Sequence, residues 1–394
     1  MNTKFFLTSI ILYLNCFLIV SQNSIDEVLQ SIEVKNETLN ALRKTTDAQI
    51  LENKTGIYLS NPQVEFGYLF GKPDPIGNRK DFSASQDFDI PTILGMKRRL
   101  ADKQNMSAEM NFKAERMGIL LEAKLLCLDL IYKNSLSDIL EKRLSNAQHI
   151  FDIYKKYLEE GNTNRLDVNK AELNLLNSQS ELRRVELERN EIINKLKLLN
   201  GGEEIYLNER QFEPILLPPG FEEWYDNAVN INPLLSFARQ EVEVSKDFVR
   251  MNKALSLPTF SAGFMSERII GETFKGVIVG ISVPLWENKN RVAHAKALVS
   301  AAEAQQVDAS LKYYLDVKNR YEIASGLNEI SQNYKNLLKS SNSAELLQKA
   351  LDAGEISLLD YLNEITLYYN SVDMALKAEL DFQKVAAELF AVEL

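Results

Sequence analysis

The sequence predicts two tandem repeats, each made of two strands followed by a long helical hairpin. Three observations support this fold class. A turn motif, Gly-x-x-[Asn/Ser]-x-Leu-Asp, begins at Gly161 and again at Gly354, 193 residues later. Pro91, at the end of an alternating apolar run, corresponds to Pro284 at the same separation. Long stretches poor in glycine and proline flank both turns, as in helical hairpins. Internal duplication of this kind determines the architecture before any single residue is interpreted.

Residues 1–22 have the pattern of a cleaved secretory signal peptide. Lys4 precedes an apolar run from Phe5 to Val20, and Ser21-Gln22 follows it. The run is shorter than the roughly 20 residues of a membrane-spanning helix, and only its N-terminal flank is basic, so we expect export and cleavage. Lipid attachment at Cys16 is the alternative. The apolar stretch continues past Cys16, which disfavours lipidation.

Composition limits what the exported chain can be. Cys127 is the only cysteine after residue 22, so no intramolecular disulfide can form. The formal net charge of −10 argues against nucleic acid as a partner. Because no later apolar run is long enough for a spanning helix, any membrane-embedded part must consist of strands.

The first repeat, residues 23–200, begins with a helix expected over about 24–57 and continues with strands at about 62–71 and 82–91. The second repeat, residues 233–394, has strands at about 258–267 and 274–284. In all four, apolar and small or polar residues alternate with the two-residue period of a strand. The predicted lipid-facing side chains are Val64, Phe66, Tyr68, Phe70, Phe82, Phe88, Phe260, Phe264, Val277, Val279 and Ile281.

Two interpretations of these strands are open. They form either two hairpins packed on a soluble core, or part of a closed barrel. Isolated hairpins are marginally stable, and the rest of the chain offers no obvious covering layer. A closed barrel leaves no strand edge exposed and tolerates lipid. Four strands cannot close a barrel, but several chains together can.

Long helices are expected from Leu94 to about Leu158, from after Gly161 to Leu199, over about 286–352, and from Ile356 to the C-terminus. The first spans about 96 Å at 1.5 Å per residue. Leu358, Ile365 and Val372 recur every seven residues, as in paired coiled helices. Residues 201–232, with four prolines or glycines near 214–220, are expected to be an irregular connector around the outside of the helices.

This order of elements resembles the TolC-like outer-membrane efflux proteins, the outer membrane factor family. The resemblance covers nearly the whole exported chain and includes the phrases 257–264 (LPTFSAGF) and 279–285 (VGISVPL). It implies a homotrimer in which each chain gives four strands to one twelve-stranded transmembrane β-barrel, continued by an α-helical barrel through the periplasm. It also implies an outer-membrane location in a Gram-negative bacterium, contact with outer-membrane lipid, and a periplasmic adaptor and an inner-membrane pump of RND or ABC type as partners.

The resemblance also indicates which residues carry function. Asp167 and Asp360 lie six residues after the tip glycines, where such channels have gate aspartates. An aspartate in the first turn of a helix is equally explained by the helix dipole, although its presence at both tips favours the gate. Some members have a locking arginine two residues after the second tip glycine. Ile356 stands there, so Arg165 is a candidate for a substitute lock and otherwise a solvated side chain. Gly161, Asn162, Gly354 and Glu355 are the expected adaptor-docking tips.

The leading hypothesis is a passive exit channel for tripartite efflux or type I secretion, and the alternative is a periplasmic coiled-coil scaffold without a pore. We find no arrangement of a nucleophile and a base, and no phosphate-binding loop, so no enzyme and no cofactor are expected. Nor is a metal site expected, because His149 and His294 have no ligand-spaced partners. Met106, Met110 and Met117 are better explained as core packing than as a metal path. No motif identifies the cargo.

Overall fold

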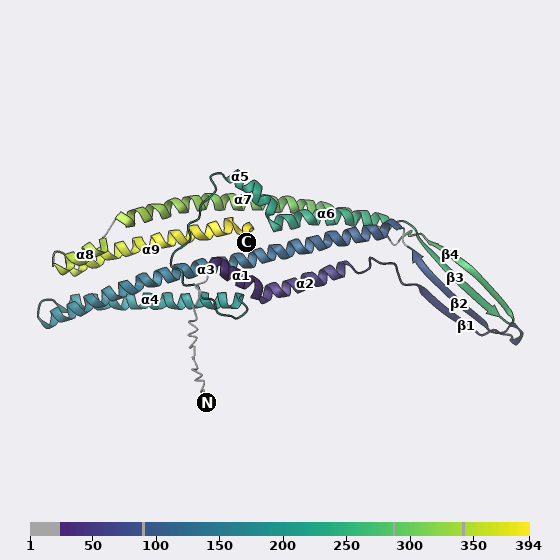
Figure 1. Cartoon of the computed structure of the whole chain (residues 1–394), viewed down its shortest axis with the longest axis horizontal. Helices are drawn as coiled ribbons and strands as arrows, with labels where there is room; N and C mark the ends of the chain where they lie inside the picture. The colour runs from purple at the N-terminus through teal and green to yellow at the C-terminus, as the bar shows by residue number, and fades with distance from the viewer. Residues whose placement is uncertain (1–23, 89–90, 287, 341–342) are drawn as a thin grey trace, which may run out of the picture.

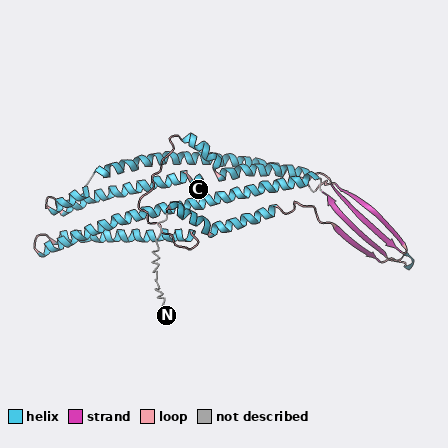
Figure 2. Cartoon of the chain, in the orientation of Figure 1, coloured by secondary structure: helices cyan, strands magenta, loops and turns pink. Residues whose placement is uncertain are grey.

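The structure, a computed structural model, describes residues 24–88, 91–286, 288–340 and 343–394. The signal peptide and Cys16 lie outside the described residues. So do residues 89 and 90 of the second expected strand. Strands are gathered at one end of an elongated molecule, and long helices joined by loops make up most of the rest (Figure 2).

Two helices, α1 (Ile25–Lys35) and α2 (Glu37–Asn53), occupy the segment where one helix was expected over 24–57. That prediction was wrong because of Asn36. Its backbone N–H donates to the Ile32 carbonyl and ends α1, while its Oδ1 accepts from the Leu39 N–H at 2.8 Å and begins α2. Its Nδ2 also donates to the Leu199 carbonyl at 2.7 Å, which holds the junction against the end of the first hairpin.

The sheet contains four antiparallel strands in chain order, namely β1 (Gln63–Leu69), β2 (Arg79–Phe88), β3 (Thr259–Ile269) and β4 (Glu272–Ser282). β2 begins three residues before its expected start. The turn at Asp74–Ile76 is short, so Arg79 and Asp81 already lie in the strand. The pairing of β2 with β3 joins the two repeats in one sheet.

The first hairpin consists of α3 (Pro91–Glu159) and α4 (Arg165–Leu199). With 69 residues, α3 spans about 104 Å. Apolar residues recur on one side of it at spacings of four, seven and three, at Leu136, Leu140, Ala147 and Ile150, and all four are buried. None of the helices among the described residues combines the length and apolar character needed to cross a bilayer.

The second half contains α5 (Phe221–Ile231), α6 (Pro233–Ala254), α7 (Arg291–Ser340), α8 (Ser343–Asp352) and α9 (Leu358–Leu389). The connector is therefore not irregular throughout. Its α5 forms because Phe221 packs on Tyr314 and Tyr321 of α7, with ring centroids 5.8 and 5.6 Å apart. The helix expected over about 286–352 is described as α7, which begins only at Arg291, and α8, and residues 341 and 342 between them lie outside the described residues. α8 packs its apolar side against α9 near the tip.

The long helices lie side by side in the order α7, α9, α3, α4 (Figure 1). Residues 201–220 cross them and tie the two halves together. The Leu207 carbonyl accepts from Asn134 of α3 at 3.1 Å, and the Glu213 carbonyl accepts from Gln383 of α9 at 2.7 Å. The Pro218 carbonyl accepts from the Tyr321 hydroxyl of α7 at 2.7 Å.

The largest apolar core lies in the middle of the molecule, where α1, α3, the end of α4 and the connector meet. It includes Val28, Ile32, Leu130 and Leu196, with Cys127 fully buried among them. Burial raises the pKa of the Cys127 thiol to about 12, with a smaller contribution from the charge of Glu209.

Cys127 is therefore expected to resist alkylation at pH 8 in the folded protein. The reactive species is the thiolate, and a pKa near 12 leaves only about one thiol in ten thousand ionised at that pH. Mass spectrometry after iodoacetamide treatment should show no adduct at Cys127 until denaturant is added. Rapid modification without denaturant would show that this core opens in the native state.

Candidate functional site

The two helical turns lie together at the end of the molecule opposite the sheet (Figure 1). A cavity of about 550 Å³ separates them and is lined from both sides, by Asn162, Thr163 and Asp167 of the first turn and by Gly354 and Ile356 of the second. The structure therefore brings together the predicted tip residues of both repeats, although 193 residues separate them in sequence.

Both turns are built in the same way. Gly161 and Gly354 have φ of +78° and +71°, the left-handed conformation that glycine adopts without strain. The Gly161 N–H donates to the Leu158 carbonyl and the Asn162 N–H to the Tyr157 carbonyl. The second tip repeats both bonds, and together they form the Schellman motif that ends a helix. Asn164 and Ser357 are the N-caps of the helices that follow.

Asp167 lies in the first turn of α4, and its backbone N–H donates to the Oδ1 of Asn164 at 3.0 Å. Its carboxylate accepts hydrogen bonds from Lys170 at 2.9 Å and from Asn164 Nδ2 at 2.9 Å. The Lys170 hydrogen bond is the main cause that lowers the pKa of Asp167, which is thus ionised at neutral pH. The side chain is half-buried at the cavity between the tips.

Asp360 has the equivalent place in α9, but it is more exposed. Its backbone N–H donates to the Ser357 hydroxyl at 3.2 Å, and that hydroxyl donates to its carboxylate at 2.6 Å. Both aspartates therefore serve their own helix ends, which accounts for the Asn/Ser and Asp positions of the repeated motif. The carboxylates still lie at the tips of the hairpins, so the capping role does not conflict with the predicted role in ion passage.

Arg165, the candidate substitute for the tip lock, forms no ion pair with a described residue and is exposed at the start of α4. Ile356 packs instead against the apolar cluster of Ile150, Leu358 and Tyr361, which holds the two hairpins together next to the tips. The position of the locking arginine is therefore occupied by Ile356, which makes an apolar contact within its own chain. Asn162 and Glu355 are exposed beside their glycines.

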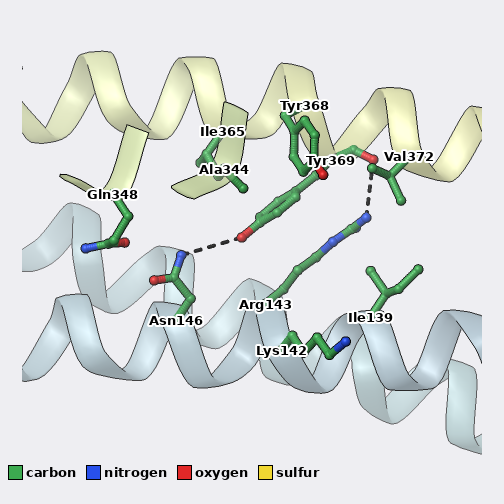
Figure 3. Close-up of a pocket in the computed structure, with 10 residues that line it drawn as sticks. All are labelled: Ile139, Lys142, Arg143, Asn146, Ala344, Gln348, Ile365, Tyr368, Tyr369 and Val372. Carbon is green, nitrogen blue, oxygen red and sulfur yellow. Dashed lines mark hydrogen bonds between the residues drawn. The ribbon is translucent and has the colours of Figure 1, made fainter. Parts of the chain in front are cut away.

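A groove of about 490 Å³ lies between α3 and α8/α9, farther from the tips (Figure 3). In Figure 3 Arg143 extends from α3 toward Tyr369 of α9, whose ring centroid lies 4.4 Å from the guanidinium. Arg143 is buried and forms a two-pronged ion pair with Asp373, at 2.6 and 2.9 Å. It also donates to the Tyr369 carbonyl at 3.2 Å.

A second polar link lies one turn closer to the tips. Asn146 of α3 donates to the Tyr361 hydroxyl at 2.6 Å, and that hydroxyl donates to Gln348 of α8 at 3.1 Å. Sequence reasoning missed these residues. The available signal was Arg143 itself, which interrupts the buried stripe of Leu136, Leu140, Ala147 and Ile150 at a position that should be apolar.

The register places ten of the eleven predicted lipid-facing residues on one face of the sheet. Directly paired residues of antiparallel strands point to the same side. One row contains Val64, Ala84, Phe264 and Val277, and another contains Phe88, Phe260 and Ile281. Phe66, Phe82, Tyr68 and Val279 fall on the same side, which we call the apolar face.

The remaining residue, Phe70, follows the end of β1 and packs edge-on against Tyr68, with ring centroids 5.0 Å apart. All eleven side chains are exposed in the single chain. The other side, the polar face, contains every carboxylate of the four strands. These are Glu65, Asp81, Asp87, Glu267 and Glu272.

The chain is similar in structure to outer-membrane channel proteins. The match to CusC, described with the formation of a transmembrane channel, has a TM-score of 0.78 and 14% identity and covers 94% of this chain and 92% of that chain. The Campylobacter jejuni CmeC outer membrane channel matches with a TM-score of 0.74 and 14% identity, over 93% of this chain and 85% of that chain. The outer membrane protein VceC of Vibrio cholerae matches with a TM-score of 0.73 and 14% identity, over 93% and 95%.

No family model matches the chain, and no curated protein matches its sequence. The structural likeness confirms the resemblance for the fold of the single chain. The chain has the fold of the TolC-like outer-membrane channels, including the strand pair and long helical hairpin in each repeat.

Proposed function

We propose that the chain is a passive exit channel, a homotrimer whose sheets form a barrel in the outer membrane of a Gram-negative bacterium and whose helices form a tube in the periplasm. The observation that carries this proposal is the exposed apolar face of the sheet, in a chain with the fold of outer-membrane channels. Transport energy comes from a partner pump. The chain is not an enzyme.

The dimensions of the sheet suit a bilayer. β3 and β4 have 11 residues each, about 37 Å along the strand. At a tilt of roughly 40° this gives a height of about 28 Å, close to the apolar band of about 25 Å on membrane barrels. One edge of β1 and one edge of β4 have no strand partner among the described residues. In the proposed trimer, β4 of each chain pairs with β1 of the next and closes a twelve-stranded barrel.

The helical part supports the same closure. α7 and α4 are the outermost of the four long helices (Figure 1). Each has exposed apolar residues spaced by seven or fourteen positions, Leu166, Leu173 and Leu187 on α4 and Ile323, Ile330 and Leu337 on α7. Such stripes are typical of helices that pack on another helix. In the trimer, α4 of one chain packs against α7 of the next.

The helical tips are the proposed gate and docking end. Three copies of Asp167 and Asp360 would surround the periplasmic entrance with carboxylates, which favours cations. The exposed tip residues Gly161, Asn162, Gly354 and Glu355 would meet a periplasmic adaptor, and through it an inner-membrane pump. Such a channel would serve either tripartite efflux or type I secretion.

Membrane fractionation and planar-bilayer recording test the proposal. The full chain expressed in a Gram-negative host should stay in the membrane fraction after a carbonate or urea wash, and the purified protein should have the mass of a trimer. It should also produce discrete single-channel currents. Release into the soluble fraction without pore formation would contradict the channel and support the coiled-coil scaffold.

The double variant Asp167→Asn/Asp360→Asn is expected to lower the preference of the channel for cations by about tenfold, the lower end of counter-ion enrichment in charged clefts. The N-caps Asn164 and Ser357 remain, so the helix ends should lose only about 0.3–1 kcal/mol each. Reversal potentials under a salt gradient measure the change. Glu203→Gln/Glu204→Gln, on the exposed connector, is the matched control. An unchanged reversal potential in the aspartate variant would exclude the proposed gate role.

A further inference from the structure

Cations are distributed unevenly over the two faces of the sheet. Lys80 pairs directly with Arg268, and Lys275 pairs with Ser266 one row away, so all three cations lie on the apolar face. No carboxylate of the strands lies on that face. Arg79, the remaining cation of the strands, lies on the polar face, where it pairs with Asp81 at 2.8 Å and Glu267 at 3.1 Å.

The three cations are exposed, and none forms an ion pair with a described residue. Lys80 Nζ lies 5.5 Å from the centroid of the Tyr68 ring, a contact that orients the amine without neutralising it. In a chain with net charge −10, this is a cluster of positive charge with its possible acidic partners on the opposite side of the sheet. We call Lys80, Arg268 and Lys275 the basic cluster.

The basic cluster lies at the end of the apolar rows. The row of Phe66 and Phe82 includes Lys275, and the next row toward the hairpin turns contains Tyr68, Lys80 and Arg268. Two residues along a strand correspond to about 7 Å. The hairpin turns are at the end of the sheet away from the helices (Figure 1). With the helices in the periplasm, this end faces the outer leaflet, at the depth where headgroups begin.

We propose that the basic cluster binds phosphate groups of lipids in the outer leaflet, while the acyl chains of those lipids lie on the neighbouring apolar rows. This inference rests on the proposed membrane channel. Long basic side chains at a membrane interface extend toward the headgroups, and clustered Lys and Arg recognise anionic lipid. Phe66 and Phe82, which lie next to the basic cluster, provide an apolar surface for the acyl chains of the same lipid. In the trimer the cluster occurs three times, once for each chain.

Binding of a phosphorylated lipid to the purified trimer tests the inference. The probes are diphosphorylated lipid A, the same lipid after enzymatic dephosphorylation, and inorganic phosphate, with native mass spectrometry in uncharged detergent as the readout. We expect lipid A to bind at least about tenfold more tightly than its dephosphorylated form, and added salt to weaken it. Inorganic phosphate should compete only at far higher concentration.

The triple variant Lys80→Gln/Arg268→Gln/Lys275→Gln should lose this preference, by about fivefold for each charge removed. The matched control, Lys44→Gln/Lys155→Gln/Lys339→Gln, removes the same charge from exposed helical positions and should bind as the wild type does. If the triple variant does not assemble, the three single variants should each show the fivefold loss. Equal binding of both lipid forms, or an unaffected cluster variant, overturns the inference.

Insertion into neutral phosphatidylcholine vesicles separates the two possible failures. A wild-type protein that inserts and conducts there, but shows no preference for phosphate, contradicts the basic cluster alone. A protein that inserts into no vesicle contradicts the channel itself, and the lipid inference falls with it.

Discussion

Val279→Arg is expected to prevent assembly of the chain in the membrane, whereas Ile278→Arg at the adjacent position is expected to be tolerated. Val279 pairs with Ala262 in the middle rows of the apolar face, and Ile278 pairs with Gly263 on the polar face. An arginine facing lipid near the centre of a membrane barrel costs about 2–4 kcal/mol, and a trimer contains it three times. The amount of washed, membrane-retained trimer is the measurement.

This pair is informative because both residues are exposed and apolar, and both are in β4. Ile278→Arg should reduce cation current without reducing the amount of trimer, since it adds positive charge to the inner side of the barrel. Val279→Leu controls for packing and should behave as the wild type. Equal tolerance of both arginines would show that the apolar face does not contact lipid.

Asp373→Ala is expected to destabilise the helical part far more than Arg143→Met. Without Asp373, the guanidinium of Arg143 stays buried, with only the carbonyl and ring of Tyr369 as partners. Removal of one partner of a buried ion pair costs about 3–5 kcal/mol. Asp373 is 32% exposed, so water screens the pair and the lower end of that range applies. Without Arg143, the carboxylate turns to water and the loss should be about 1 kcal/mol.

Urea-induced loss of helical circular dichroism measures these changes. The double variant Arg143→Met/Asp373→Ala should be close to Arg143→Met alone, because the methionine removes the buried charge that Asp373 neutralises. Such non-additivity identifies a direct pair. Equal and additive losses in the two single variants would show instead that Arg143 is held by its other neighbours.

The faces of the strands could be predicted from the sequence because a two-residue period assigns each side chain without knowledge of the pairing. The observed strand register places ten of the eleven predicted lipid-facing residues on the same face of the sheet. The tips could also be predicted, because Gly161 and Gly354 each adopt the left-handed backbone conformation that ends a helix and favours glycine.

The misses have different causes. Asn36 divides the first expected helix in two. Its side chain caps α2 and also donates a hydrogen bond to the carbonyl of Leu199, and the polar–apolar pattern of a helix does not reveal a bond to such a distant residue. The pairing of Arg143 with Asp373 spans 230 residues, and one sequence contains no signal for a contact at that distance. The gate role of Asp167 and Asp360 is still a prediction, because their cap function explains the motif by itself.

The open edges of β1 and β4 have a consequence for cells that make a mixture of sound and defective chains. In the proposed trimer, the sheet of each chain is completed only by the sheets of two other copies. The stability of the barrel therefore depends on the concentration of chains in the membrane. With equal amounts of both chains and random assembly, only about one ring in eight contains three sound copies. A faulty chain that still assembles should therefore be strongly dominant over the sound one.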